Sequence, residues 1–189
     1  VSGDAKRQQQ MKKTAITFLA FLLLWSITIG QTKKDLNIDF MLRGHIYAKS
    51  SIKDTTAVGG FASSDNMPKK IKDKNYFSDN GLFLKIDTTK TVIINDKFYG
   101  YRLFIGNKSD TIVQLDASDS RLYVIAEVYY KDIWQPIEYL PSSWCGNSYH
   151  KVYLNQNEYW TFDIPKFNGK INTKLRYRLT IDNDKYIYS

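Results

Sequence analysis

The chain has 189 residues, and its 27 lysines and arginines against 19 acidic residues give a formal net charge of +8 at pH 7. Its single cysteine excludes an internal disulfide, and two histidines with one cysteine are a poor ligand set for a structural zinc ion. The basic residues are spread along the chain, which indicates a solvated basic surface and no nucleic-acid partner.

The first thirty residues have the pattern of an export signal. Residues 1–10 are polar and unpatterned, and we expect them to be upstream translation, with Met11 as the true start. Residues 11–30 form a signal peptide: a basic start, an apolar run and small residues ending at Gly30. The alternative is an uncleaved N-terminal helix that tethers the protein to a membrane, because the apolar run approaches the shortest bilayer span. Both interpretations predict an exported protein, periplasmic or extracellular.

Residues 31–80 are expected to hold an N-terminal strand and a long polar loop. The stretch 36–50 shows a broken alternation that is consistent with one strand. Residues 51–80 are rich in Ser, Asp, Asn, Lys and Gly and have no lasting apolar period, which is typical of a loop. A loop of this length is uncommon in a compact domain, so we expect one short element within it.

From Gly81 to the end, the sequence predicts β-strands throughout. Short alternating or β-branched runs follow one another, and they are separated by turn residues such as "GNKSD", "DASDS" and "YKD". No run of helical period interrupts them. We therefore predict an all-β fold: an antiparallel β-sandwich over residues 81–189, preceded by the N-terminal signal helix.

The clearest predicted hairpin spans residues 157–181 and turns at Asn168-Gly169. Asn-Gly is a strong hairpin signal because both central residues of a type I′ turn need positive φ. The resulting register places Trp160 opposite Tyr177 on an apolar face. Pro165 cannot donate to a strand ladder, so the alternative is that the chain leaves one sheet there and enters the facing sheet. Both versions predict the same inward residues.

The stretch "LNQNEYWTFDIP" followed by "TKLRYRLTI" resembles the closing strands of immunoglobulin-like β-sandwich domains in exported bacterial proteins. Leu154, Asn157 and Glu158 match the turn that leads into those strands, and Gln156 stands where the family often has Pro or Gly. The resemblance covers about residues 81–189 and implies an immunoglobulin-like β-sandwich. It carries over no catalytic residue, because such modules are mostly structural or binding domains. We also expect the sequence to stop inside a final edge strand.

The only cysteine lies in "SSWCGNSYH", residues 142–150, where Trp-Cys-Gly is followed by a serine at the place of a second redox cysteine. Thioredoxin-type chemistry needs a helix after Gly146 to stabilise the thiolate, but the following residues alternate like a strand. We therefore expect a turn in which Trp144 and Cys145 face the core. The alternative is an envelope enzyme with Cys145 as thiol nucleophile and His150 as base.

Aromatic residues are the remaining functional signal. Some must face outward, because neighbouring residues of a strand point to opposite faces, and exposed rings anchor protein partners or stack on sugars. The candidate binding residues are Trp134, Trp144, Tyr149 and Trp160. The chain has no glycine-rich phosphate loop and no Gly-x-Ser-x-Gly elbow, so we expect no cofactor, no metal and no catalytic residue. The sequence thus predicts a non-enzymatic module that binds a protein or a glycan at the cell envelope, with a carbohydrate-binding module as the alternative.

Overall fold

The computed structural model describes residues 36–37, 41–73, 76–77, 79–182 and 184–189. The expected upstream segment and signal helix, residues 1–30, lie outside the described residues. In the part that is described, no helix is long and apolar enough to cross a membrane. Apart from a three-residue 3-10 helix at Gly146–Ser148, the regular elements of this part are all strands, as the sequence predicts.

The strands mostly follow the predicted runs. In chain order they are β1 (Leu36–Asn37), β2 (Leu42–Arg43), β3 (Lys69–Lys70), β4 (Leu82–Ile94), β5 (Phe98–Asn107), β6 (Val113–Ser118), β7 (Arg121–Leu122), β8 (Val124–Tyr130), β9 (Ile133–Pro136), β10 (Glu138–Tyr139), β11 (Tyr149–Leu154), β12 (Glu158–Pro165), β13 (Phe167–Asn168), β14 (Leu175–Asp182) and β15 (Lys185–Tyr188). Residues 82–94 form one long strand, β4, whose pairing with β5 shifts register between Asp87 and Val92.

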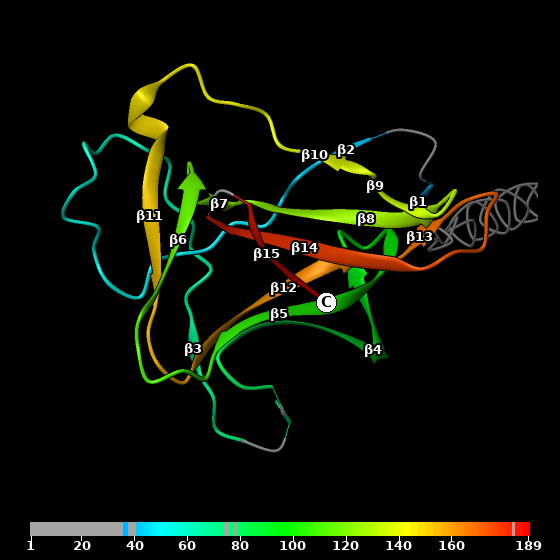
Figure 1. The fold of residues 1–189 in the computed structure, drawn as a ribbon, viewed down its shortest axis with the longest axis horizontal. Helices are drawn as coiled ribbons and strands as arrows, with labels where there is room; N and C mark the ends of the chain where they lie inside the picture. Colours follow the sequence, from blue (N-terminus) through cyan, green and yellow to red (C-terminus); the bar gives the residue numbers. More distant parts are fainter. Residues whose placement is uncertain (1–35, 38–40, 74–75, 78, 183) are drawn as a thin grey trace, which may run out of the picture. The chain divides into compact units, whose positions relative to one another are not determined.

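Antiparallel sheets dominate the arrangement shown in Figure 1. Two four-stranded sheets have the orders β3-β12-β5-β4 and β15-β14-β8-β9, and a three-stranded sheet has the order β11-β6-β7. Only Tyr123 separates β7 from β8, so one stretch of chain links the three-stranded sheet to the sheet of β14. Two short parallel pairs, β1 with β13 and β2 with β10, form separate two-stranded sheets.

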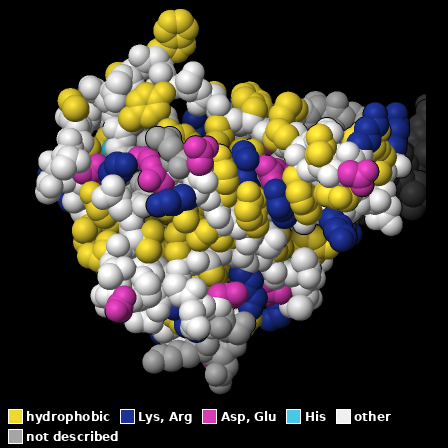
Figure 2. All heavy atoms as spheres, in the orientation of Figure 1, with side chains coloured by type: hydrophobic (Ala, Val, Ile, Leu, Met, Phe, Trp, Pro, Cys, Tyr) yellow, Lys and Arg dark blue, Asp and Glu magenta, His cyan; other side chains and the backbone are white. Residues whose placement is uncertain are grey.

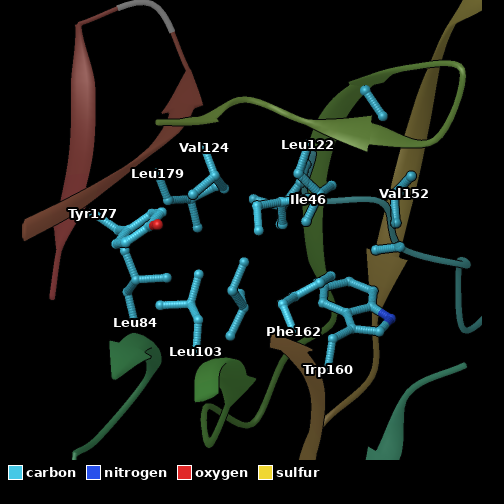
Figure 3. Packing of buried hydrophobic residues seen from close by; sticks show 14 of the residues in the cluster. Ile46, Leu84, Leu103, Leu122, Val124, Val152, Trp160, Phe162, Tyr177 and Leu179 are labelled. Carbon is cyan, nitrogen blue, oxygen red and sulfur yellow. The ribbon is translucent and has the colours of Figure 1, made fainter. Parts of the chain in front are cut away.

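The hydrophobic core lies between two layers of strands. Figure 3 shows Leu84, Leu103, Phe162 and Trp160 on one side of it, facing Ile46, Leu122, Val124, Tyr177 and Leu179 on the other. Within β12 and β14 the buried residues recur at every second position, as strand geometry requires. Because a fully buried large apolar side chain contributes about 1.5–3 kcal/mol, this cluster is the main source of stability.

A second, smaller cluster covers the outer face of the β4-β5-β12 sheet. Phe77, from the segment after β3, packs with Phe83 and Phe104 at centroid distances of 5.0 and 5.3 Å. Gly106 leaves room for this packing, since a Cβ there would lie 2.2 Å from Cζ of Phe83. The polar segment that the sequence marks as a loop therefore contributes Phe77 to a small apolar cluster on this sheet.

Tight turns join several neighbouring strands. The β6–β7 turn is Asp119-Ser120, with φ of 50° and 63°, and the β8–β9 turn is Lys131-Asp132, with φ of 52° and 62°. Two-residue turns with positive φ at both positions match the twist of the strands that they join. These two turns confirm the turns predicted from "DASDS" and "YKD".

The hairpin predicted at Asn168-Gly169 is wrong, and its alternative is confirmed. β12 pairs with β5, whereas β14 pairs with β8 in the other four-stranded sheet. Pro165 is the last residue of β12 and lies opposite Gly100. At the end of a strand, the missing N–H of a proline removes no hydrogen bond from the interior of the ladder. The inward residues are those that both versions predict, because Trp160 and Tyr177 are fully buried on opposite sides of the core.

The single strand predicted for residues 36–50 is also wrong. β1 and β2 pair with different partners, and Tyr47 forms an isolated bridge with Arg121. At Gly44 the chain packs so tightly that a Cβ would lie 2.6 Å from Cδ2 of Leu140. The short element expected within 51–80 is β3, which pairs with β12.

Candidate functional site

The four aromatic residues predicted to bind a partner do not form one site. Trp160 is fully buried in the core, and its Nε1 donates to the Lys49 carbonyl at 2.9 Å. Its prediction as a binding residue is wrong, because the alternation of β12 turns it inward. Trp144 and Tyr149 are exposed and belong to the segment before and at the start of β11. Trp134 is half-buried on β9.

The expectation that Trp144 and Cys145 face the core is wrong, since both are exposed. They lie in the segment between β10 and the 3-10 helix, where no sheet turns their side chains inward. The strand predicted after Gly146 is confirmed as β11, and it buries His150. The His150 ring nitrogens contact Ser148 O at 3.0 Å and Ser120 Oγ at 3.5 Å, and no hydrogen bond among the described residues joins His150 to Cys145.

The outer face of the β15-β14-β8-β9 sheet carries a set of stacked arginine and aromatic side chains. On β14, Tyr177 and Leu179 point into the core, so Arg176 and Arg178 point outward. The Arg176 guanidinium lies 4.1 Å from the Trp134 ring centroid and 3.8 Å from that of Tyr188. We call this surface the arginine–aromatic face; it consists of Tyr129, Trp134, Arg176, Arg178, Tyr186 and Tyr188.

The carboxylate of Glu127 contacts the guanidinium groups of both Arg176 and Arg178. This carboxylate is buried, and its Oε2 accepts from Arg176 Nε at 2.9 Å and lies 2.8 Å from Arg176 Nη2. Its Oε1 lies 3.2 Å from Arg178 Nε, an ion-pair contact without hydrogen-bond alignment. Arg178 also lies 4.7 Å from the ring centroid of Tyr186. These contacts hold the two guanidinium groups in place. Figure 2 shows hydrophobic (yellow) and basic (dark blue) side chains alternating where Figure 1 places β14 and β15.

Glu138 and the hydroxyl of Tyr177 are polar groups buried inside the fold. Glu138 is 1% exposed; its Oε2 accepts from Ala126 N at 2.9 Å, and its Oε1 lies 3.7 Å from His45 Nδ1. Burial raises the pKa of Glu138 to about 7, against the opposing effect of the Ala126 N–H. Burial also places the pKa of Tyr177 well above its usual value, and the Glu138 charge adds to this shift. Within the described residues, Glu138 Oε1 and the Tyr177 hydroxyl lack hydrogen-bond partners, so this cluster weakens the fold when it is ionised.

The segment 50–54 protects the free edge of β11. Backbone N–H groups of Lys151, Tyr153 and Asn155 point to this edge, at every second residue. They donate to Asp54 Oδ2 at 2.8 Å, Ser50 Oγ at 2.8 Å and Ser51 Oγ at 3.2 Å, respectively. These side-chain oxygens accept the hydrogen bonds that the carbonyls of a neighbouring strand would otherwise accept. The edge is therefore not available for pairing with a strand of another molecule. Residues 49–63 also wall a pocket of about 450 Å³ beside His150.

The sequence indicates part of the arginine–aromatic face, but it gives no sign of the pocket beside His150. The alternation of "LRYRL" indicates that Arg176 and Arg178 face away from the core, but it does not identify Trp134 and Tyr188 as their neighbours. Asp54 and His150 lie far apart in the chain and carried no local signal of a shared pocket. No three His, Cys, Asp or Glu residues of the described part of the chain are grouped so that they could hold a metal ion.

No protein-family model matches the chain, and no curated protein or solved structure shows a significant similarity to it. The structure defines the chain as an all-β protein with several antiparallel sheets. Its function must therefore be argued from its own surfaces.

Proposed function

We propose that the chain is an exported, non-enzymatic, immunoglobulin-like β-sandwich that binds a protein partner at the cell envelope through the arginine–aromatic face. Two layers of antiparallel strands around one core, together with the sequence resemblance of residues 81–189, support the fold assignment. The signal pattern of residues 11–30 supports export. The observation that carries the binding role is Arg176, held between Trp134 and Tyr188 on an outward sheet face.

The composition of this face favours a protein partner. Trp, Tyr and Arg are the residues that most often dominate the binding energy of protein interfaces. Glu127 and the flanking rings already hold Arg176 in one position, so binding loses little side-chain entropy. One face each of Trp134 and Tyr188 is covered by this guanidinium, which leaves less ring surface for stacking on a sugar.

Site-specific photo-crosslinking in cells tests this proposal. A photoreactive phenylalanine placed at Tyr129 or Tyr186 should give the same discrete adduct with one partner protein. The matched control is the same residue at Tyr99 of β5, a similarly exposed tyrosine on the other four-stranded sheet, which should not give that adduct. Equal adducts from face and control positions, or no discrete adduct from the face, would contradict the proposal.

The purified partner then allows a quantitative measurement. Arg176→Ala removes the stacked guanidinium and should weaken binding by about tenfold or more, as for an interface hot spot. Arg102→Ala is the control, because Arg102 contacts Asp163 on the other four-stranded sheet and both side chains are about half exposed. Similar affinities for the two variants would show that the arginine–aromatic face is not the interface.

The exposure of Trp144 supports a second candidate function, carbohydrate binding. The side chain is fully solvent-accessible, and an indole ring in this position can stack on a sugar ring. Titration of a glycan panel, followed by tryptophan fluorescence, should then give a saturable change that Trp144→Ala abolishes and Trp134→Ala preserves. A panel without any saturable change would exclude this function for the loop.

A further inference from the structure

A pocket of about 450 Å³ lies between residues 49–63, the β6–β7 turn and β11. This volume falls in the range of about 300–1,000 Å³ that is common for small-molecule sites. Phe61 and His150 line the pocket, with their rings stacked at a centroid distance of 3.7 Å and an interplanar angle of 10°. Ser120 contributes from the turn. The pocket is separate from the arginine–aromatic face, since the two share no residue.

The wall of the pocket is preformed. Asp54, one of its lining residues, is buried and accepts from Lys151 N at 2.8 Å and from Thr56 N and Oγ1 at 2.9 and 2.7 Å. Burial alone would raise the pKa of Asp54, but these hydrogen bonds outweigh it and hold the pKa below its usual value. Ser51, from the same segment, donates to Glu158 at 2.6 Å. The segment is therefore fastened to β11 and β12, so a ligand need not order it.

His150 offers an incompletely used hydrogen-bonding atom. Its Nδ1 lies 3.0 Å from the Ser148 carbonyl, which can only accept, so Nδ1 carries the proton and Nε2 is the acceptor of the neutral ring. The single described contact of Nε2 is Ser120 Oγ at 3.5 Å, and the Ser120 hydroxyl already donates to Ala62 O at 2.9 Å. Nε2 thus lacks a good donor, although His150 is buried, with only 7% of the residue exposed. A ligand hydroxyl would supply this donor.

The charges around the pocket favour an anion. Lys49, Lys53 and Lys151 line it, against one carboxylate, Asp54, which the hydrogen bonds above already occupy. Lys151 pairs with Asp116. Lys49 and Lys53 form no ion pair with any carboxylate in the described part of the chain. These two ammonium groups remain available to a ligand.

We propose that this pocket binds a small hydroxylated organic anion. A ligand hydroxyl donates to His150 Nε2, the anionic group lies near Lys49 and Lys53, and the carbon skeleton contacts Phe61. A sugar acid or a sugar phosphate has this combination of groups. The site requires neither the protein partner nor the fold family proposed above.

Three probes with one carbon skeleton test the proposal: glucuronate, glucose 6-phosphate and glucose, titrated into ¹⁵N-labelled full-length protein. At least one anion should produce saturable NMR shifts at Gly59, Gly60, Ser120 and His150, and should bind roughly tenfold more tightly than glucose. The comparison of the two anions identifies the preferred group, carboxylate or phosphate. Equal binding of glucose, or no saturation by either anion, would overturn the proposal.

Variants separate ligand contacts from folding. Lys53→Gln changes an exposed residue and should weaken anion binding while leaving glucose binding and the unfolding midpoint unchanged. Lys97→Gln, in the β4–β5 turn, is the matched control and should leave anion binding unchanged. His150→Gln should weaken all three probes if the variant keeps the dispersed spectrum of the fold. If Lys53→Gln and Lys97→Gln weaken anion binding equally, the attraction is general to a basic surface and the assigned site is wrong.

Discussion

The buried carboxyl of Glu138 predicts an unusual pH dependence of stability. Replacement by glutamine, Glu138→Gln, removes the ionisable group but keeps an oxygen that can accept from Ala126 N–H. In the folded protein burial raises the pKa of Glu138 from 4.5 to about 7. The folded state therefore holds this proton more tightly than the unfolded state, and stability decreases as the pH rises from about 4.5 to about 7.

The size of the effect follows from this difference in pKa. At about 1.4 kcal/mol per pKa unit, ionised Glu138 costs the folded state about 3 kcal/mol above pH 7 and nothing below about pH 4.5. Glu138→Gln should therefore raise the free energy of unfolding by up to about 3 kcal/mol at pH 8, but by less than about 1 kcal/mol at pH 5. Tyr177 does not interfere, because its pKa lies well above 10.

His45 contributes with the opposite sign and needs its own control. Burial lowers the pKa of His45 below 6.5, so its contribution to stability is lost as the pH falls through that lowered value. Urea unfolding, followed by the fluorescence of the buried Trp160, should be measured between pH 5 and 8.5 for the wild type and Glu138→Gln. The same pair is then compared in a His45→Gln background. Parallel stability curves for wild type and Glu138→Gln would refute the reasoning, because the carboxylate would then be compensated inside the core.

Two further predictions concern packing and exposure. Gly106→Ala places a Cβ 2.2 Å from Phe83 Cζ and should lower the free energy of unfolding in urea by roughly 1–3 kcal/mol. Gly146→Ala is the control: its Cβ meets nothing within 4 Å, so the unfolding midpoint should stay unchanged. Equal midpoints for the two variants would show that the Phe83 ring moves aside freely. Cys145 is exposed, so an aromatic disulfide reagent should label it as fast in the native protein as in urea, and slow native labelling would place the thiol inside the fold.

The strand pattern and the inward residues follow from the sequence because they depend on local chemistry. A period of two decides which side of a strand is apolar, so the strand register places Trp160 and Tyr177 in the core whichever strands pair. The separate prediction of Trp160 as a binding residue is wrong because it ignores this period. The turns at Asp119-Ser120 and Lys131-Asp132 are also local, since they depend on residues that tolerate positive φ.

The orientation of the segment before β11 was predicted incorrectly for a related reason. Trp144 and Cys145 are apolar residue types, and hydrophobicity alone places such residues in a core. No strand ladder includes them, however, and the 3-10 helix that follows does not bury them. Hydrophobicity favours burial, but only a neighbouring sheet provides the surface against which a side chain is buried.

By itself, the sequence determined that this chain forms β-strands, where most of them lie and which residues they bury. The tertiary structure decided which strands pair, because ladders such as β12–β5 and β14–β8 join residues that are distant in the chain and have many apolar alternatives. It alone brought Arg176 between Trp134 and Tyr188, and His150 against Phe61. Both surfaces on which we base function depend on long-range pairing. A local pattern therefore indicates which side chains face outward, but it does not identify their neighbours.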